Sequence, residues 1–295
     1  MNGIFNINKP AGRSSHDIVN AVRRCSRLPR VGHAGTLDPM ATGVLLICVG
    51  QAVRVTEYLA DHDKKYRARV CLGVETDTYD ATGAIVAQRE VAVTREQIES
   101  ALGSFVGKIA QSPPAYSAIK RDGVPLYKLA RRGVEFETAP REIEIFSIAC
   151  IDVTLPEILI DVHCSKGTYI RSLAHDLGEK LGCGAHLTAL TRTASGHFVI
   201  DDAITLDQLC EACKGGYVER FLNPLDEALL RFEAVVVAPD VAKRIQQGKE
   251  LTSDDDHATS LLRVYSANGE FIALMERGGA PNVWKPKKVF VIRNS

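Results

Sequence analysis

Several features that mark other classes of protein are missing from this chain of 295 residues. It has no run of about 18 consecutive apolar residues, which a membrane-spanning helix requires. Residues 1–5 do not begin the basic and then apolar pattern of a secretory signal. Internal repeats and low-complexity tracts are absent as well. We therefore expect a cytoplasmic protein that makes no contact with membranes.

Sequence signatures of cofactors and metals are also missing. The chain has no glycine-rich fingerprint of a nucleotide-binding loop. Its one Cys-x-x-Cys pair, Cys210 and Cys213, has no second pair of Cys or His residues at zinc spacing. Both cysteines follow a capping box at Thr205 on the apolar side of a helical pattern, which predicts buried core cysteines. Eight cysteines in a chain of this length fit a reducing compartment, and we expect neither a metal nor a cofactor.

Net charge is absent too, because 36 basic and 36 acidic residues cancel. The charges are nevertheless segregated along the chain. Residues 1–37, 108–134 and 277–295 each carry a net charge of +5, whereas residues 201–256 carry −7. Three basic blocks and one acidic stretch favour a polyanionic partner. A solvated surface with chance clustering explains the same distribution equally well.

The composition is that of a globular protein, with 45% apolar and 24% charged residues, and the length suggests one large or two unequal domains. Strands are expected at residues 4–7, 44–49, 66–72, 142–148 and 158–164. Helices are expected after Ser14 or Ser15, after Thr94 and after Thr168. Helices do not separate the strands regularly, so the pattern favours an α+β fold over a doubly wound parallel sheet. We expect a mixed, largely antiparallel sheet with flanking helices.

Residues 111–141 differ from this pattern. They contain four prolines, two glycines and most of one basic block. The segment therefore predicts an irregular excursion between strands of the sheet. Loops of this length are usually functional or disordered.

The pattern of expected secondary structure changes again after about residue 230. An Asn268-Gly269 turn separates two apolar runs, which predicts a hairpin of residues 261–265 and 271–275. A helix from Val241 to Gly248 and a closing strand at 289–292 are also expected. These elements predict a compact β-rich module.

A single acid, Asp38, lies in the constrained segment that runs from His33 to Gly43, immediately before a buried strand. Pro39 excludes Asp38 from helical conformation and removes the next amide donor. A turn or helix-cap aspartate explains the local pattern by itself. The density of glycine, proline and threonine around Asp38 favours a functional acid.

Residues 32–45, Gly-His-Ala-Gly-Thr-Leu-Asp-Pro-Met-Ala-Thr-Gly-Val-Leu, closely resemble the catalytic motif of the bacterial TruB family of tRNA pseudouridine synthases. Further motifs of the family are matched in order by residues 8–15, 65–83, 114–131 and 165–171. The resemblance covers about residues 3–230, and the tail more weakly resembles the PUA-like module of bacterial members. It implies a catalytic domain of the pseudouridine synthase fold over residues 1–230, with an RNA-gripping insertion at about 111–141. Residues 231–295 then correspond to a PUA-like RNA-binding module.

The resemblance also implies the reaction, in which uridine 55 (tRNA numbering) of the T loop becomes pseudouridine. The base leaves C1′, turns and is rejoined through C5, so no cofactor is needed. The essential aspartate of the family corresponds to Asp38, and its arginine partner corresponds to Arg171. Three routes stay open, namely attack of Asp38 on C6, attack on C1′, or removal of a sugar proton to give a glycal. Each route needs an ionised, desolvated carboxylate, which a fixed cation nearby would stabilise.

Five more residues correspond to positions of the family's active site. Tyr66 matches the tyrosine that stacks on the target base, Tyr169 a second active-site tyrosine, and Leu190 a residue lining the uracil pocket. His33 matches the histidine that fills the space left by the flipped base. Asp80 resembles an acid of the charge network around the catalytic aspartate. A place in the core is the alternative for Tyr66 and Leu190, and a turn is the alternative for Asp80.

RNA contacts are implied in the first two basic blocks, at Lys9, Lys120, Arg121, Arg131 and Arg132. The expected partner is the T arm and elbow of a tRNA, bound by a monomer, and a second role in tRNA folding is compatible with this activity. Three other functions remain open: a non-catalytic RNA-binding or tRNA-folding protein, a guide-dependent pseudouridine synthase, and a uridine methyltransferase with a cysteine nucleophile. The presence of Asp38, the lack of lysine-rich extensions and the lack of a cysteine in a constrained motif argue against them in turn.

Overall fold

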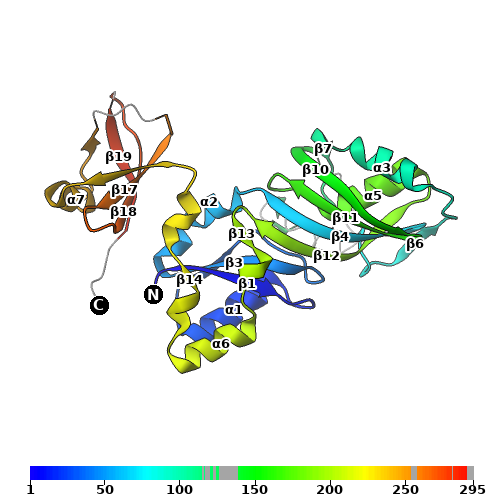
Figure 1. Cartoon of the computed structure of the whole chain (residues 1–295), viewed down its shortest axis with the longest axis horizontal. Coiled ribbons are helices and arrows are strands. Elements are labelled where there is room, and N and C mark those ends of the chain that lie inside the picture. The colour runs from blue at the N-terminus through cyan, green and yellow to red at the C-terminus, as the bar shows by residue number, and fades with distance from the viewer. Residues whose placement is uncertain are drawn as a thin grey trace.

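The computed structural model describes residues 1–114, 116, 120–121, 124–125, 139–253, 258–280 and 282–290 (Figure 1). A sheet of ten strands occupies most of the molecule, and a second sheet of five strands lies at the C-terminal end. Among the paired strands of the large sheet in this part of the chain, β3 and β12 run parallel and the other pairs are antiparallel. The predicted α+β fold with a mixed, largely antiparallel sheet is therefore confirmed.

The strands of the large sheet follow the order β14-β1-β3-β12-β4-β11-β10-β7, with β2 beside β3 and β13 beside β12. Their bounds are β1 (Gly3–Lys9), β2 (Val31–Ala34), β3 (Thr42–Val49), β4 (Lys64–Leu72), β7 (Gly107–Gln111), β10 (Arg141–Thr154), β11 (Glu157–Cys164), β12 (Ala185–Ser195), β13 (Phe198–Val199) and β14 (Leu222–Asn223). Two small hairpins lie outside it, β5 (Val74–Thr76) with β6 (Ile85–Gln88), and β8 (Lys120–Arg121) with β9 (Val124–Pro125). The second hairpin belongs to the predicted excursion, of which residues 111–114, 116 and 139–141 are also described, and the rest of that segment lies outside the described residues.

Strand β3 is buried on both faces, as its uninterrupted apolar sequence predicts. Leu45, Ile47 and Val49 point into the larger hydrophobic cluster, which also contains apolar residues of α1 (Ser15–Ser26), α3 (Arg95–Gly103), α5 (Ile170–Leu181) and α6 (Leu206–Gly215). Val44 and Leu46 point into a second cluster on the other face, together with residues of η1 (Gly50–Val55) and α2 (Thr56–Ala60). The four longer helices thus cover one face of the sheet.

Three of these helices begin at capping boxes, with Ser14, Thr94 and Thr205 as the N-cap residues. The sequence predicted Thr94 and Thr205, and it left the first position open between Ser14 and Ser15. It was wrong for α5, because Tyr169 is the N-cap residue there and no side chain caps the helix. Thr168 donates instead to the backbone oxygen of Ser165 (3.0 Å), inside the loop that precedes α5.

The sheet of five strands has the order β15-β17-β18-β19-β16. It comprises β15 (Glu233–Val237), β16 (Leu251–Thr252), β17 (Leu261–Ser266), β18 (Phe271–Arg277) and β19 (Val283–Val289), with α7 (Pro239–Gln246) packed against it. The predicted hairpin is confirmed as β17 and β18. The closing strand was placed too late, since it ends at Val289, and residues 291–292 lie outside the described part. Short 3-10 helices η2 (Ile200–Asp202), η3 (Val218–Phe221) and η4 (Leu225–Leu229) occur before this sheet.

Cys210 does not have the environment that the sequence predicted. It forms a disulfide with Cys25, which joins α1 to α6 across 185 residues of chain. Cys213 is a free, partly buried cysteine packed against the core. Helical spacing alone placed Cys210 on the apolar side of α6, but it could not show that the end of α1 lies opposite.

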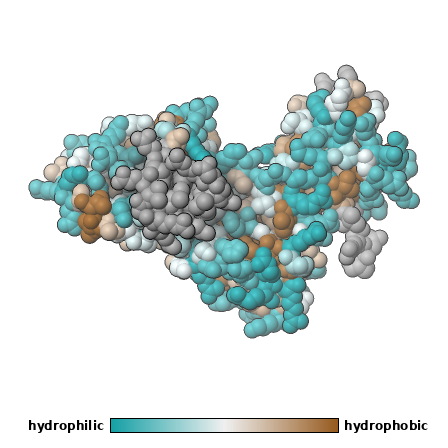
Figure 2. All heavy atoms as spheres, turned by 180° about the vertical axis from the view of Figure 1, so that it is seen from behind, coloured by the Kyte–Doolittle hydropathy of each residue, from teal (hydrophilic) through white to brown (hydrophobic). Residues whose placement is uncertain are grey.

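Among the described residues, no helix has the length and apolar character to cross a membrane. Seen from the opposite side in Figure 2, the coloured surface is mostly hydrophilic, and hydrophobic residues gather only in small separate patches.

Candidate active site

Asp38 lies in the loop between β2 and β3, at the centre of the large sheet. The side chain of Ser15, in the first turn of α1, fixes the preceding residue: its Oγ accepts from the Leu37 N–H (2.8 Å) and donates to the Leu37 carbonyl (3.0 Å). Gly43 lets β3 approach β12 closely, because a Cβ there would lie 2.2 Å from the Arg192 carbonyl oxygen. The loop is therefore held on both sides of the carboxylate.

Lys9 also holds this loop, which corrects its prediction as an RNA contact. The side chain is 0% exposed, and its Nζ donates to the backbone oxygens of Pro10 (2.9 Å), Pro39 (3.2 Å) and Ala41 (2.6 Å). Burial lowers the pKa of Lys9 to about 8. An ammonium with three carbonyl partners inside the protein is not available to a phosphate, so Lys9 is part of the support of the Asp38 loop.

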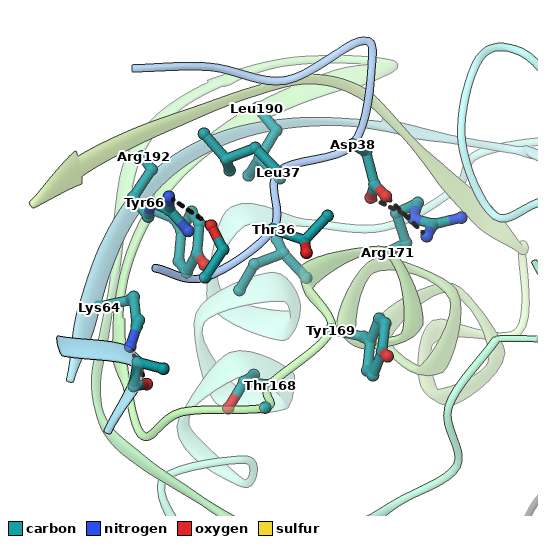
Figure 3. A pocket seen from close by; sticks show the side chains of 14 residues that line it. Thr36, Leu37, Asp38, Lys64, Tyr66, Thr168, Tyr169, Arg171, Leu190 and Arg192 are labelled. Carbon is teal, nitrogen blue, oxygen red and sulfur yellow. Dashed lines mark hydrogen bonds and ion pairs between the residues drawn. The ribbon is translucent and has the colours of Figure 1, made fainter. Parts of the chain in front are cut away.

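Arg171 is the cation that the carboxylate of Asp38 contacts (Figure 3). Nε of Arg171 lies 2.9 Å from Oδ2 of Asp38, and Nη2 donates to Oδ1 at 3.2 Å. Nη1 lies 3.4 Å from Oδ2 of Asp80 and donates to the Thr78 carbonyl at 3.3 Å. The side chains of Arg171 and Asp80 are 5% and 6% exposed, so water screens their interaction little, whereas the 35% exposed Asp38 is screened in part.

Asp80 is a buried member of this network. Its Oδ1 accepts hydrogen bonds from the Thr78 hydroxyl (2.9 Å) and from both the N–H (2.9 Å) and the hydroxyl (2.6 Å) of Thr82. The loop between β5 and β6 thus fixes Asp80, and Asp80 fixes the far side of the guanidinium. Both readings of Asp80 hold together, since this acid lies in a turn and also contacts Arg171.

The protonation of Asp38 depends on opposing effects. Burial raises the pKa of its carboxyl above the ordinary value, the positive charge of Arg171 lowers it, and the negative charge of Asp80 raises it. The Asp38 side chain is still 35% exposed, toward the cavities described next. The fixed guanidinium therefore favours an ionised carboxylate in a place where burial disfavours it.

Two cavities meet at Asp38 and share Thr36, Leu37, Asp38 and Arg171. The first has a volume of about 360 Å³ and lies over the strands. The second has a volume of about 740 Å³ and lies between the start of α1 and the loop that follows β5. Both volumes fall within the range of about 300–1,000 Å³ that is usual for ligand sites.

The first cavity brings together most of the predicted site. Tyr66 of β4, Leu190 of β12, Tyr169 and Arg171 line it with Asp38, and Figure 3 shows their side chains around one space. Leu190 is 7% exposed and Tyr66 packs partly against the core, so each belongs to the core and also forms a wall of the cavity. Aromatic and aliphatic walls beside a single ion pair suit a flat, polar ring such as a nucleobase.

His33 lines the second cavity, next to Asp38 but outside the first. Its Nδ1 is buried and has no hydrogen-bond partner among the described residues. Burial lowers the pKa of His33, and the charge of Arg192 lowers it further. The ring is therefore neutral at neutral pH and can stack.

Two cations at the site were missed in the sequence. Arg192 is 1% exposed, and it donates from Nε to the Val44 carbonyl (2.6 Å) and from Nη2 to the Gly35 carbonyl (3.1 Å). Lys64 is 5% exposed, lines the first cavity and donates to the Ala60 carbonyl (2.6 Å). Burial lowers the pKa of Lys64 to about 8. The signal that could have revealed Lys64 and Arg192 is a charged residue at a strand position that the sequence pattern predicts to be buried.

The remaining predicted RNA contacts are not placed by the structure. Only the backbone of Lys120 and Arg121 is described, in β8, and Arg131 and Arg132 lie outside the described residues.

Across the part of the chain that is described, no three His, Cys, Asp or Glu side chains lie close enough to hold a metal ion.

Comparison of the sequence with family profiles gives three successive matches. Residues 23–170 match the TruB family pseudouridylate synthase N-terminal domain. Residues 171–230 match the tRNA pseudouridylate synthase B C-terminal domain, and residues 234–278 match the C-terminal domain described as pseudouridine synthase II TruB.

Two curated relatives are each named tRNA pseudouridine synthase B. The protein of Alkaliphilus oremlandii is 47% identical over 254 residues, which are 86% of this chain and 84% of that protein. The protein of Dehalococcoides mccartyi (strain ATCC BAA-2100) is 42% identical over 292 residues, 99% of this chain and 97% of that protein.

Solved structures share the fold over nearly the whole chain. An H/ACA RNP bound to a substrate RNA containing 2′-deoxyuridine has a chain that matches with a TM-score of 0.75 and 24% identity, covering 99% of this chain and 86% of its own. A Cbf5-Nop10-Gar1 complex matches with a TM-score of 0.75 and 25% identity, covering 98% of this chain and 85% of its own. The profile matches and the curated relatives show that the chain belongs to the TruB family of pseudouridine synthases.

Proposed function

We propose that the protein converts uridine 55 in the T loop of tRNA to pseudouridine, with Asp38 as the catalytic residue. The observation that carries this proposal is the Asp38 carboxylate, held by Arg171 at the junction of two cavities. Curated relatives that are 41–47% identical to this chain are named tRNA pseudouridine synthase B, which supports tRNA as the substrate. The choice of uridine 55 rests on the resemblance of residues 32–45 to the family's catalytic motif.

The chemistry assigns a task to each wall of the first cavity. The bond between N1 of uracil and C1′ breaks, a bond between C5 and C1′ forms, the proton on C5 leaves, and N1 gains a proton. Asp38 serves attack on C6, attack on C1′ or removal of a sugar proton, since each route needs a carboxylate oxygen beside this bond. Tyr66 and Leu190 bound the space in which the detached base turns. Because the Arg171 side chain is buried and contacts Asp38 directly, its charge acts on the Asp38 carboxylate in every route.

The second cavity fits the extraction of the base. A uridine in a folded loop is stacked, and moving it out costs a few kcal/mol. His33 presents a flat, neutral ring next to Asp38, and can take the place of the extracted base in the stack.

The basic segments outside the cavities fit a tRNA partner. Arg13, Arg24, Arg27 and Arg30 of the first block are exposed, and Arg13 directly precedes Ser14, which lines the second cavity. We assign this block and the insertion at 111–141 to the T arm and elbow, and the PUA-like module of residues 231–295 to the acceptor end. The protein acts as a monomer in the cytoplasm in this proposal.

Replacing Asp38 with asparagine tests the proposal. The variant keeps the shape of the side chain but loses the charge, so we expect tRNA binding to stay within about twofold while product formation is abolished. Pseudouridine is mapped chemically in an unmodified tRNA after incubation with the wild type or the variant. Asp161→Asn is the control, because Asp161 is an exposed acid that pairs with Arg67 away from the cavities. Product at another uridine, or full activity of Asp38→Asn, would contradict the proposal.

A further inference from the structure

Gln111, the last residue of β7, bonds to the backbone of an active-site residue in a distant part of the chain. Its side chain is 2% exposed. The side-chain oxygen accepts a hydrogen bond from the Tyr169 N–H at 2.8 Å, and the side-chain nitrogen donates to the Tyr169 carbonyl at 3.0 Å. The side-chain amide of Gln111 thus satisfies both backbone polar groups of Tyr169, as the backbone of a paired strand would.

Tyr169 is the residue at which such a contact matters most. It is the N-cap residue of α5, with extended backbone (φ −98°, ψ 107°) and no side-chain cap. Its ring lines the first cavity, and Arg171, the partner of Asp38, follows two residues later. A rotation of the Tyr169 backbone would move the ring and the first turn of α5 together.

The same two segments are joined by two neighbouring hydrogen bonds. The Ser172 hydroxyl donates to the Ser112 carbonyl at 2.9 Å, and Nη2 of Arg171 donates to the Tyr116 carbonyl at 3.1 Å. Residues 111–116 form the start of the predicted RNA-gripping insertion. The entrance to this insertion is therefore bonded directly to the part of α5 that carries the active site.

We propose that Gln111 is a positioning residue for pseudouridine formation, which fixes the backbone of Tyr169 and thereby sets the ring of Tyr169 and the guanidinium of Arg171 relative to Asp38. Gln111 does not line either cavity, so it acts through Tyr169 rather than on the substrate. The inference rests on the proposed function of this site. It predicts loss of turnover rather than loss of tRNA binding, because none of the basic blocks changes.

Replacing Gln111 with glutamate gives a test that a purely structural role would not satisfy. A protonated glutamic acid has the shape of glutamine, with a carbonyl that accepts from the Tyr169 N–H and a hydroxyl that donates to the Tyr169 carbonyl. The ionised form has no donor and turns a negative oxygen toward that carbonyl. Burial favours the protonated form, so lowering the pH restores the pair of hydrogen bonds.

The experiment measures kcat and KM for pseudouridine formation in unmodified tRNA from about pH 5.5 to about pH 8.5. At the alkaline end we expect kcat of Gln111→Glu to fall between about tenfold and about a hundredfold, the scale expected when reacting groups are misplaced by about 1 Å. Its kcat relative to wild type should recover as the pH falls, while KM stays within about twofold. Gln111→Met, which lacks both polar atoms, should lose kcat at every pH without recovery.

Two controls complete the test. Ser172→Ala removes a hydrogen bond between the same segments without touching Tyr169, and we expect kcat within about threefold of wild type. In a Tyr169→Ala background, the loss caused by Gln111→Met should be smaller than in wild type but not absent, because the ring is gone while the backbone of residue 169 still bonds to Gln111 and positions Arg171. Three results would overturn the inference. The first is a ratio of kcat for Gln111→Glu to kcat for wild type that does not change with pH, and the second is a loss of kcat in Ser172→Ala equal to that in Gln111→Met. The third is fully additive losses of kcat when Gln111→Met is combined with Tyr169→Ala. Each ratio is taken on whichever uridine the wild type modifies, so a wrong target uridine contradicts the proposed function alone.

Discussion

Replacing Arg171 with methionine tests whether its guanidinium keeps Asp38 ionised. The side chain is 5% exposed and contacts Asp38 through Nε at 2.9 Å and Nη2 at 3.2 Å. Methionine fills a similar space without a charge. The carboxylates of Asp38 and Asp80 then lose the cation that they share, and each also feels the negative charge of the other.

The size of the effect follows from the interaction of two charges. Opposite unit charges about 4 Å apart interact by about 4 kcal/mol near a protein surface. Water in the cavity screens this pair, because 35% of the Asp38 side chain is exposed, so we expect only part of that energy. Burial raises the pKa of Asp38 and Arg171 opposes the rise, so the variant has the higher pKa and loses its ionised carboxylate at a higher pH than wild type. The acidic limb of the pH–rate profile should move upward by about 1–2 pH units.

The assay is single-turnover formation of pseudouridine in an unmodified tRNA from about pH 5 to about pH 9, with circular dichroism to show that each variant is folded. Arg171→Lys is the matched control, because it keeps the charge and loses the forked geometry. Its acidic limb should move less than that of Arg171→Met. An acidic limb of folded Arg171→Met that coincides with wild type would refute the reasoning.

Three further predictions concern stability and RNA binding. Burial lowers the pKa of Lys9 to about 8 in the folded protein, so between about pH 8 and its ordinary value of 10.5 the unfolded chain binds the additional proton and the free energy of unfolding rises with pH. Lys9→Met should remove roughly 3 kcal/mol of this rise, measured by urea unfolding at both ends of the window; equal slopes in both proteins would contradict the buried ammonium. Cys25→Ser should lower the free energy of unfolding by about 2–5 kcal/mol without reductant and leave it equal to wild type with reductant, whereas equal stability without reductant would show that the disulfide contributes nothing. Replacing Lys120, Arg121, Arg131 and Arg132 with alanine should reduce the slope of log affinity against log salt by about 3, and an unchanged slope would mean that this block does not contact phosphate.

The sequence was most informative where a local pattern decides the structure. The apolar run of residues 44–49 predicted a buried strand, and the capping boxes at Thr94 and Thr205 placed the starts of two helices. The motif around Asp38, with Arg171 far along the chain, predicted a pair that the structure shows as a direct contact. Here the resemblance to a family supplied the pairing, since spacing in the sequence could not.

It was least informative where distant segments determine the environment of a side chain. Lys9 looked like a surface cation, but its three carbonyl partners include Pro39 and Ala41, which approach only when β1 and β3 pair. Cys210 looked like an unpaired core residue, because nothing in the sequence shows that Cys25, on another helix, lies next to it. Gln111 carried no signal at all, since a lone glutamine at a strand end is ordinary until Tyr169 is placed beside it.

The second hydrophobic cluster has a consequence for the synthesis of the protein. Val44 and Leu46 of β3 belong to it together with Leu261 and Leu274 of the C-terminal sheet and with Phe290, which follows β19. Ribosomes add about 5–20 residues per second, so several seconds pass between the emergence of residue 230 and that of residue 290. During that interval the nascent chain has the residues that surround Asp38 but lacks part of the cover on one face of the large sheet. The C-terminal sheet therefore completes the core of the molecule, and a chain that stops before it would leave apolar surface open to aggregation.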